Sequence, residues 1–134
     1  MNTLSVSHLF EVLIAYSDSE QSQVLATILG HCGLMPVLCS SLKEARTLLG
    51  RESIRLVFCE ERLGEETFRD VLQETFKLGL PLVVFSRRDD SKLRLDAAGS
   101  GILSWISPPF HHRQIEGIVN KILRSTPAKV ARQS

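Results

Sequence analysis

The residue best placed to do chemistry in this sequence is an acid that follows a short apolar run. Residues 56–59 (Leu-Val-Phe-Cys) are consecutively apolar, and Glu60 comes directly after them. A continuous apolar run of this length is typical of a strand that is buried on both faces of a parallel sheet. Open α/β sheets bind ligands at the edge formed by the carboxyl ends of their strands. Glu60 is therefore the first candidate for a functional residue.

Further polar side chains follow other apolar runs and are expected at the same edge. Ser17 and Asp18 come after residues 12–16, and Ser86 comes after residues 80–85. Asp18 has two roles open to it, a ligand for a metal ion or the cap of the helix that begins there. We favour the cap, because aspartate is strongly preferred at that position.

Five apolar runs that alternate with helical patterns must position these residues. The predicted strands are residues 12–16, 35–39, 56–60, 80–85 and 102–106. The predicted helices begin near Ser17, Ser41, Gly64, Asp90 and His111, and the last one ends at Arg124. The third has an apolar stripe of Phe68, Val71, Leu72 and Phe76, whereas the fourth has only Leu93 and Ala97.

This alternation implies parallel strands that are joined by right-handed crossovers, with helices on both faces. The sequence thus predicts an α/β fold: a flavodoxin-like, doubly wound, five-stranded parallel sheet of order 2-1-3-4-5. Residues 1–10 are predicted to be an N-terminal arm, residues 11–124 the domain, and residues 125–134 a polar tail or the start of a linker. Strands 1 and 3 are neighbours in that order, so Tyr16, Ser17, Asp18 and Glu60 are expected to surround one crevice.

The composition excludes several classes of protein. The chain has 134 residues and a formal net charge of +1, so no strong field attracts it to nucleic acid or to an anionic membrane. No apolar run approaches the roughly 18 residues of a membrane span. Cys32, Cys39 and Cys59 lack the spacing of a zinc site or of a disulfide framework, so we expect buried, reduced thiols in a cytoplasmic protein. We expect no cofactor, no bound metal and no enzymatic activity.

Taken in order, these segments resemble the receiver domains of bacterial two-component response regulators over residues 11–124. Glu60 falls at the position of the phosphorylated aspartate, Ser86 at that of the switch hydroxyl, and Trp105 at that of the mobile aromatic residue. Pro108-Pro109-Phe110 is similar to the Lys-Pro-Phe motif, in which the proline often follows a cis bond. The remaining matched stretches are residues 12–14 and 97–101.

The departures from the family pattern concern its charged residues. The acidic pair that holds Mg²⁺ falls on Tyr16 and Ser17, Glu60 replaces the aspartate, and Pro108 replaces the lysine. Phosphoryl transfer depends on positioning and on the neutralisation of charge, and both neutralising groups are missing. The sequence therefore predicts that ordinary aspartyl phosphorylation is lost.

Several alternatives stay open at the level of single residues. Glu60 either accepts a hydrogen bond from Ser86 permanently, with Trp105 turned in behind it, or is a solvated acid at the end of a strand. Tyr16 could fill the metal position with its ring or belong to the core, and the two interpretations are compatible. Trp105 is more often packed than mobile at such a position. We expect residues 87–90 to be a solvated charged loop, and His111 and His112 to be solvated as well.

The function predicted from the resemblance is an atypical receiver domain that acts by binding a protein partner, such as a sensor kinase or an output domain. The family commonly uses its fourth helix, fifth strand and fifth helix for this purpose, here residues 90–124, and a homodimer through that face is a hypothesis. One alternative is a receiver that is still phosphorylated with Mg²⁺ on Asp18 and Glu60. The other is a small-molecule binder, although the glycine-free residues 17–21 argue against a nucleotide or flavin.

Overall fold

A computed structural model describes residues 10–88, 92, 94–95 and 99–133, with the backbone alone for residues 125–133. Its main sheet consists of β1 (Glu11–Ala15), β2 (Met35–Cys39), β3 (Ile54–Glu60), β6 (Leu82–Phe85) and β7 (Ser104–Ile106). All neighbouring strands are parallel, in the order β2-β1-β3-β6-β7. The predicted sheet order is confirmed, and β3 is the central strand.

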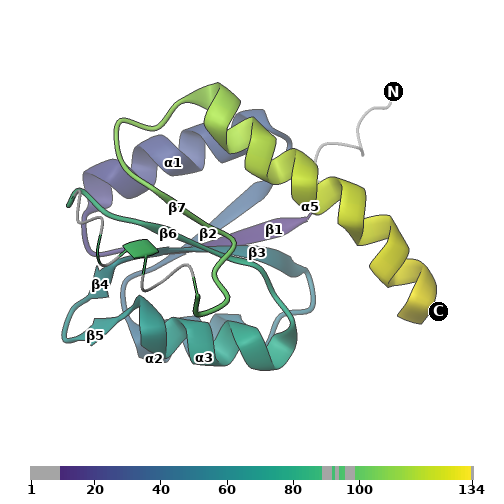
Figure 1. The fold of residues 1–134 in the computed structure, drawn as a ribbon, viewed down its shortest axis with the longest axis horizontal. Helices are drawn as coiled ribbons and strands as arrows, with labels where there is room; N and C mark the ends of the chain where they lie inside the picture. The colour runs from purple at the N-terminus through teal and green to yellow at the C-terminus, as the bar shows by residue number, and fades with distance from the viewer. Residues whose placement is uncertain (1–9, 89–91, 93, 96–98, 134) are drawn as a thin grey trace.

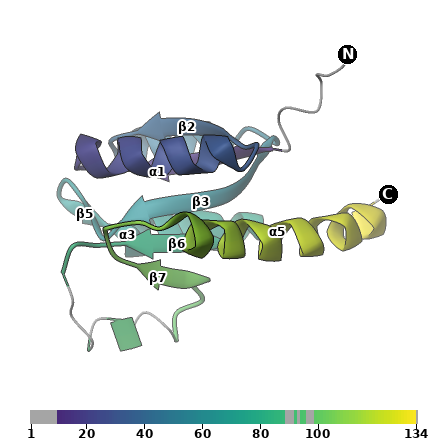
Figure 2. The ribbon, with the colours of Figure 1, turned by 90° about the horizontal axis from the view of Figure 1, so that it is seen from above.

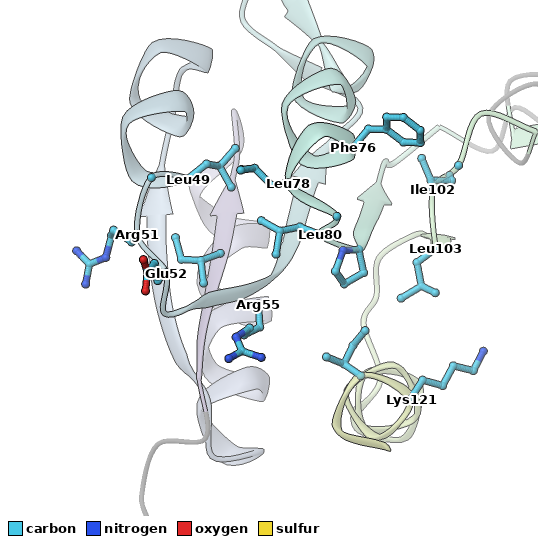
Figure 3. A pocket seen from close by; sticks show the side chains of 16 residues that line it. Leu49, Arg51, Glu52, Arg55, Phe76, Leu78, Leu80, Ile102, Leu103 and Lys121 are labelled. Atoms are coloured by element: carbon cyan, nitrogen blue, oxygen red, sulfur yellow. The ribbon is translucent and has the colours of Figure 1, made fainter. Parts of the chain in front are cut away.

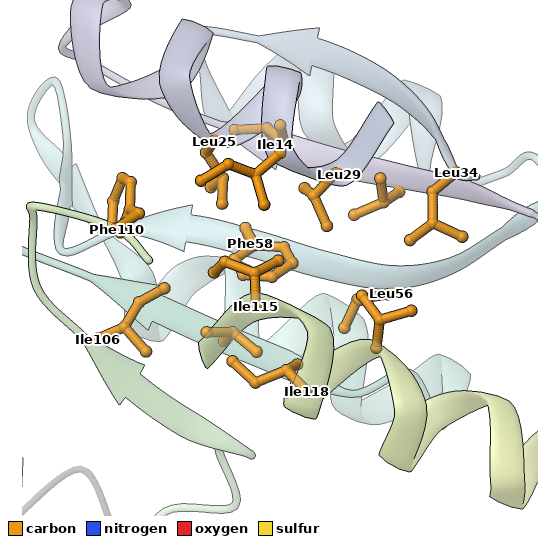
Figure 4. Close-up of a cluster of buried hydrophobic side chains, with 14 of the residues drawn as sticks. Ile14, Leu25, Leu29, Leu34, Leu56, Phe58, Ile106, Phe110, Ile115 and Ile118 are labelled. Carbon is orange, nitrogen blue, oxygen red and sulfur yellow. The ribbon is translucent and has the colours of Figure 1, made fainter. Parts of the chain in front are cut away.

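The helices cover both faces of the sheet (Figures 1 and 2). α1 (Ser19–His31) and α5 (His112–Gln133) lie on one face, and α2 (Leu42–Leu48) and α3 (Phe68–Leu78) lie on the other. Successive residues of a strand point to opposite faces, so each strand supplies two cores. In β1, Val12 and Ile14 join the cluster under α1 and α5 that Figure 4 shows, whereas Leu13 and Ala15 join the cluster under α2 and α3.

Capping side chains explain where two of the helices begin. Ser41 accepts a hydrogen bond from the backbone N–H of Glu44 at 3.1 Å and so caps α2 near the predicted start of that helix. The Glu44 carboxylate accepts from the N–H of Ser40 rather than from that of Ser41. Thr67 and Asp70 form a reciprocal capping box at the start of α3.

The structure corrects three predicted boundaries. α5 continues to Gln133, so residues 125–133 are helical and not a tail; Ala128, Lys129, Ala131 and Arg132 favour helix, whereas Pro127 opposes it. α3 starts at Phe68 rather than near Gly64, because a small hairpin of β4 (Arg62–Leu63) and β5 (Glu66–Thr67) comes first. The last strand starts at Ser104 rather than at residue 102.

Two further predictions have different outcomes. Phe76 was expected to face the core with the rest of its helical stripe, but its side chain is 76% exposed. The helix predicted over residues 90–98 lies mostly outside the described residues. Within the described part of the chain, no helix has both the length and the apolarity that a membrane crossing requires.

Candidate functional site

Glu60, the last residue of β3, holds the loop between β1 and α1 against the centre of the sheet. Its Oε1 accepts hydrogen bonds from the backbone N–H groups of Ser17 at 2.6 Å and Asp18 at 2.9 Å. Both donors lie just before the N-terminus of α1, where the helix dipole favours a negative charge. Glu60 is thus neither bound to Ser86 nor a merely solvated acid.

Asp18 caps α1, as predicted. Its Oδ1 accepts from the backbone N–H groups of Glu20 at 2.9 Å and Gln21 at 3.3 Å. Its Oδ2 forms an ion pair with the guanidinium group of Arg87. Arg87 belongs to the charged loop that we expected to be solvated; its side chain is 58% exposed, and its charge is also paired across the edge of the sheet.

Ser86 finds its partner in the next acid along the chain, Glu61. The Ser86 hydroxyl donates to Oε1 of Glu61 at 2.6 Å and accepts from the backbone N–H of Arg88 at 3.0 Å. The Arg88 side chain donates through Nε to Oε1 of Glu61 at 3.2 Å and pairs through Nη2 with Oε2. We call Glu61, Ser86 and Arg88 the carboxylate clasp.

Strand register explains why Glu61, and not Glu60, meets Ser86. β3 and β6 are paired with Glu60 opposite Phe85, and the N–H of Glu61 continues the ladder to the carbonyl oxygen of Phe85 at 2.8 Å. One residue further, Glu61 and Ser86 therefore lie beside each other on the same side of the sheet. The hypothesis that Ser86 is engaged by a carboxylate identified the right hydroxyl and the wrong acid.

The carboxylate of the clasp is buried, whereas the Arg88 side chain that pairs with it is 60% exposed. The Glu61 residue is only 7% exposed. The pKa of Glu61 lies below its usual value. The hydrogen bond from Arg88 lowers it most, and the bond from Ser86 and the charge of Arg88 lower it further. Together they outweigh burial, which raises it. A carboxylate that is buried and held by a bidentate arginine keeps its charge and its geometry at neutral pH.

The residues at the family's acidic-pair positions have other partners. Tyr16 is half-buried and packs against the cluster under α1 and α5, which agrees with its assignment to the core. The Ser17 hydroxyl donates to the carbonyl oxygen of Arg62 at 2.8 Å. Ser17 therefore ties the β1 end to the β4–β5 hairpin.

The residues at this edge do not fit a Mg²⁺ site. Mg²⁺ needs several oxygen ligands in near-octahedral geometry. Both oxygens of the Asp18 carboxylate are engaged by the α1 N–H groups and by Arg87, and Oε1 of Glu60 accepts from two N–H donors. Across the described residues, no three His, Cys, Asp or Glu side chains are grouped as a metal site would require.

Trp105 is packed inward, next to the clasp's edge of the sheet. It is 8% exposed, and its ring meets Phe68 of α3 edge to face at a centroid distance of 5.5 Å. The indole Nε1 and the Ser107 hydroxyl are buried with no hydrogen-bond partner among the described residues. The bond between Pro108 and Pro109 is cis, as the resemblance to the Lys-Pro-Phe motif implied.

His111 and His112 are exposed, and the His112 ring also stacks on that of His31 at a centroid distance of 5.5 Å. Cys39 and Cys59 are buried and Cys32 is half-buried, and all three are free thiols. None of these residues contributes to the clasp.

Comparison with solved structures identifies the fold, whereas comparison with sequences does not. A scan against protein-family models finds no match, and a search of curated proteins finds none either. A response regulator from Thermotoga maritima matches with a TM-score of 0.75 and 24% identity, over 86% of this chain and 98% of that one. The signal receiver domain of a putative Luxo repressor protein from Vibrio parahaemolyticus matches with a TM-score of 0.81 and 11% identity, over 93% of this chain and 98% of that one.

A response regulator receiver domain protein from Clostridium thermocellum is similar as well, with a TM-score of 0.79 and 18% identity over 90% of this chain and 98% of that one. These neighbours share the sheet order and the helices on both faces that are described above. The chain therefore has the CheY-like, flavodoxin-like fold of response regulator receiver domains.

Proposed function

We propose that this chain is an atypical receiver domain of two-component signalling that holds one conformation without phosphorylation and acts by binding a protein partner. The observation that carries the proposal is the hydrogen bond from Ser86 to Glu61 at 2.6 Å. By resemblance, Ser86 is the hydroxyl that would otherwise respond to a phosphoryl group. Here a permanent carboxylate supplies the acceptor.

The electrostatics of the edge support the absence of phosphoryl transfer. The Lys position of the family holds Pro108, and the acidic-pair positions hold Tyr16 and Ser17. Glu60 stands where the nucleophile would be, and its Oε1 is committed to two backbone donors. An incoming phosphoryl group would find no metal ion to neutralise it and an acceptor that is already hydrogen-bonded.

The packing of Trp105 supports a single fixed state. Its ring is held against Phe68, and its backbone carbonyl accepts from Arg94 at 3.3 Å. By analogy with the family, the partner would be a sensor kinase or an output domain that meets residues 90–124. A homodimer through that surface is the competing arrangement. A molecular mass in solution that equals that of the monomer at every protein concentration would exclude the homodimer.

Intact mass spectrometry after incubation with Mg²⁺ and a small phosphodonor tests the loss of phosphorylation. We expect no phosphate adduct, while an ordinary receiver domain in the same reaction gains one. A stoichiometric adduct on Glu60 or Asp18 would overturn the proposal and favour the phosphorylatable alternative. A nucleotide or flavin released on denaturation would favour the small-molecule binder.

A further inference from the structure

A groove crosses the edge of the sheet opposite to the carboxylate clasp. It lies where β3 and β6 begin, between the C-terminal end of α3 and the segment that leads into β7, and α5 forms one side (Figure 3). Its volume is about 980 Å³. The clasp lies at the carboxyl ends of the same strands, so the two sites are separated by the length of the sheet.

The groove gathers apolar side chains that the fold leaves uncovered. Phe76, Leu78 and Leu103 line it and are 76%, 53% and 39% exposed. Among the described residues, six large hydrophobic side chains are exposed, and these three are half of them. Exposed apolar side chains that are concentrated in one hollow mark an interaction surface, whereas scattered ones do not.

The rim of the groove is positively charged. Arg55 and Lys121 line it, and the side chain of neither has an ion pair or hydrogen bond with any described residue. In Figure 3 they lie on one side of the groove, with Phe76 on the other. Arg51 also lines the groove, but its guanidinium pairs with Glu11 at 2.6 Å; Glu52 is the acid among the lining residues.

This pattern selects one kind of occupant. An apolar floor with two unpaired cations at its side complements a segment that carries apolar side chains on one face and carboxylates beside them. Nucleic acid fits less well, because binding it requires many phosphate contacts and the chain has a formal net charge of only +1.

We propose that this groove binds an acidic, amphipathic segment of a partner protein. Apolar side chains of that segment cover Phe76, Leu78 and Leu103, and its carboxylates pair with Arg55 and Lys121. Leu103 and Lys121 belong to the residues 90–124 that the receiver family commonly uses, whereas Arg55, Phe76 and Leu78 lie outside that range. The proposal does not depend on the clasp.

The test titrates the ¹⁵N-labelled full chain with a synthetic amphipathic helical peptide that has leucines on one face and glutamates beside them. We expect saturable shifts of the amide signals of Phe76, Leu78, Leu103 and Lys121, which weaken as salt is added. The double variant Arg55→Glu, Lys121→Glu should bind about tenfold more weakly. The matched control Lys43→Glu, Arg113→Glu makes the same change of charge at exposed residues outside the groove and should bind like the wild type.

The apolar floor is tested by Phe76→Ser against Leu95→Ser, since both side chains are about three-quarters exposed and neither change should unfold the chain. Only the first should weaken binding. The proposal fails if the groove signals do not move, if a peptide with lysine in place of glutamate binds equally well, or if the control variants lose as much affinity. It also fails if a single-stranded RNA binds there more tightly, or if the same signals shift with protein concentration alone, which would indicate a second copy.

The peptide titration separates this proposal from the proposed receiver function. Glu61→Gln, which alters the clasp, should leave peptide affinity unchanged. Loss of peptide binding in that variant would contradict the independence of the two edges.

Discussion

At the scale of single residues, the central feature is the carboxylate clasp, in which Glu61 engages the Ser86 hydroxyl. The sequence left two interpretations of Glu60 open, an acceptor for the Ser86 hydroxyl or a solvated acid, because Glu60 aligns with the family's aspartate. The β3–β6 register instead puts Glu61 beside Ser86. Two adjacent acids at a strand end point in different directions, and only the register says which one meets the neighbouring strand.

The substitution Glu61→Gln should lower the free energy of unfolding at neutral pH by about 1–2 kcal/mol, because it removes a charge-assisted bond inside a buried network. The pKa of Glu61 is lower in the folded chain than its ordinary value of 4.5, chiefly through Arg88. The stability that the charged Glu61 contributes is therefore complete above about pH 4.5 and is lost as the pH falls through the folded-state pKa.

Urea unfolding at pH 7 and at about pH 3 measures this dependence. The difference in the free energy of unfolding between wild type and variant should be smaller in acid. The pKa values of Glu11 and Glu44 are also lowered. Their effect on the free energy of unfolding cancels in the comparison, because the wild type and the variant both contain them. A difference that is equal at both pH values would contradict this account.

The three thiols should differ in reactivity. Burial raises the pKa of the Cys39 thiol to about 11 and raises that of Cys59 further still. The pKa of Cys32 is also raised by burial, but its side chain is half-buried rather than enclosed. Because the thiolate is the reactive form, we expect a thiol reagent at neutral pH to modify at most Cys32 in the native chain and all three cysteines in denaturant. Rapid native labelling of Cys39 or Cys59 would show that the core opens readily.

At the scale of elements, acidic side chains join the loop after β1 to the two neighbouring strands. Glu60 at the end of β3 binds the N–H groups of Ser17 and Asp18, and Asp18 pairs with Arg87 after β6. These contacts use the carboxylates that a metal ion would need. The edge is consequently closed by protein groups rather than left open for a ligand.

The substitution Asp18→Ala should destabilise the chain by about 1 kcal/mol, since it removes the cap of α1. Asp18→Ser retains a capping oxygen and removes only the pairing with Arg87. Because that arginine side chain is more than half exposed, the serine variant should lose well under about 1 kcal/mol. Thermal or urea unfolding of both variants makes the comparison, and equal losses would mean that the ion pair, not the cap, stabilises this corner.

Much of the element pattern could be predicted from the sequence, because continuous apolar runs and helical stripes are local signals. The β4–β5 hairpin could not, since each of its strands has only two residues. The exposure of Phe76 depends on where α3 ends relative to the sheet, which helical spacing alone does not determine. The ion pairs of Arg87 and Arg88 were missed for a similar reason: a charged loop looks solvated until the opposite strand end is placed.

At the scale of the whole molecule, the two edges of one parallel sheet have opposite character. At the carboxyl edge, ion pairs and hydrogen bonds to the carboxylates of Glu60 and Glu61 hold Ser86 and the β1–α1 loop in place. At the amino edge, uncovered apolar side chains and unpaired cations form the groove that we propose as a docking site. We therefore propose a division of roles on one fold, with the carboxyl edge fixed by protein contacts and the amino edge available to a partner.

The central claim is that the carboxylate clasp holds Ser86 in one state that phosphoryl chemistry does not change. The most direct measurement records the amide signals of Ser86 and Arg88 and the indole signal of Trp105 in the ¹⁵N-labelled chain, before and after Mg²⁺ and a small phosphodonor are added. The account predicts one set of signals that stay in place. A second set, or a saturable shift of all three, would contradict it.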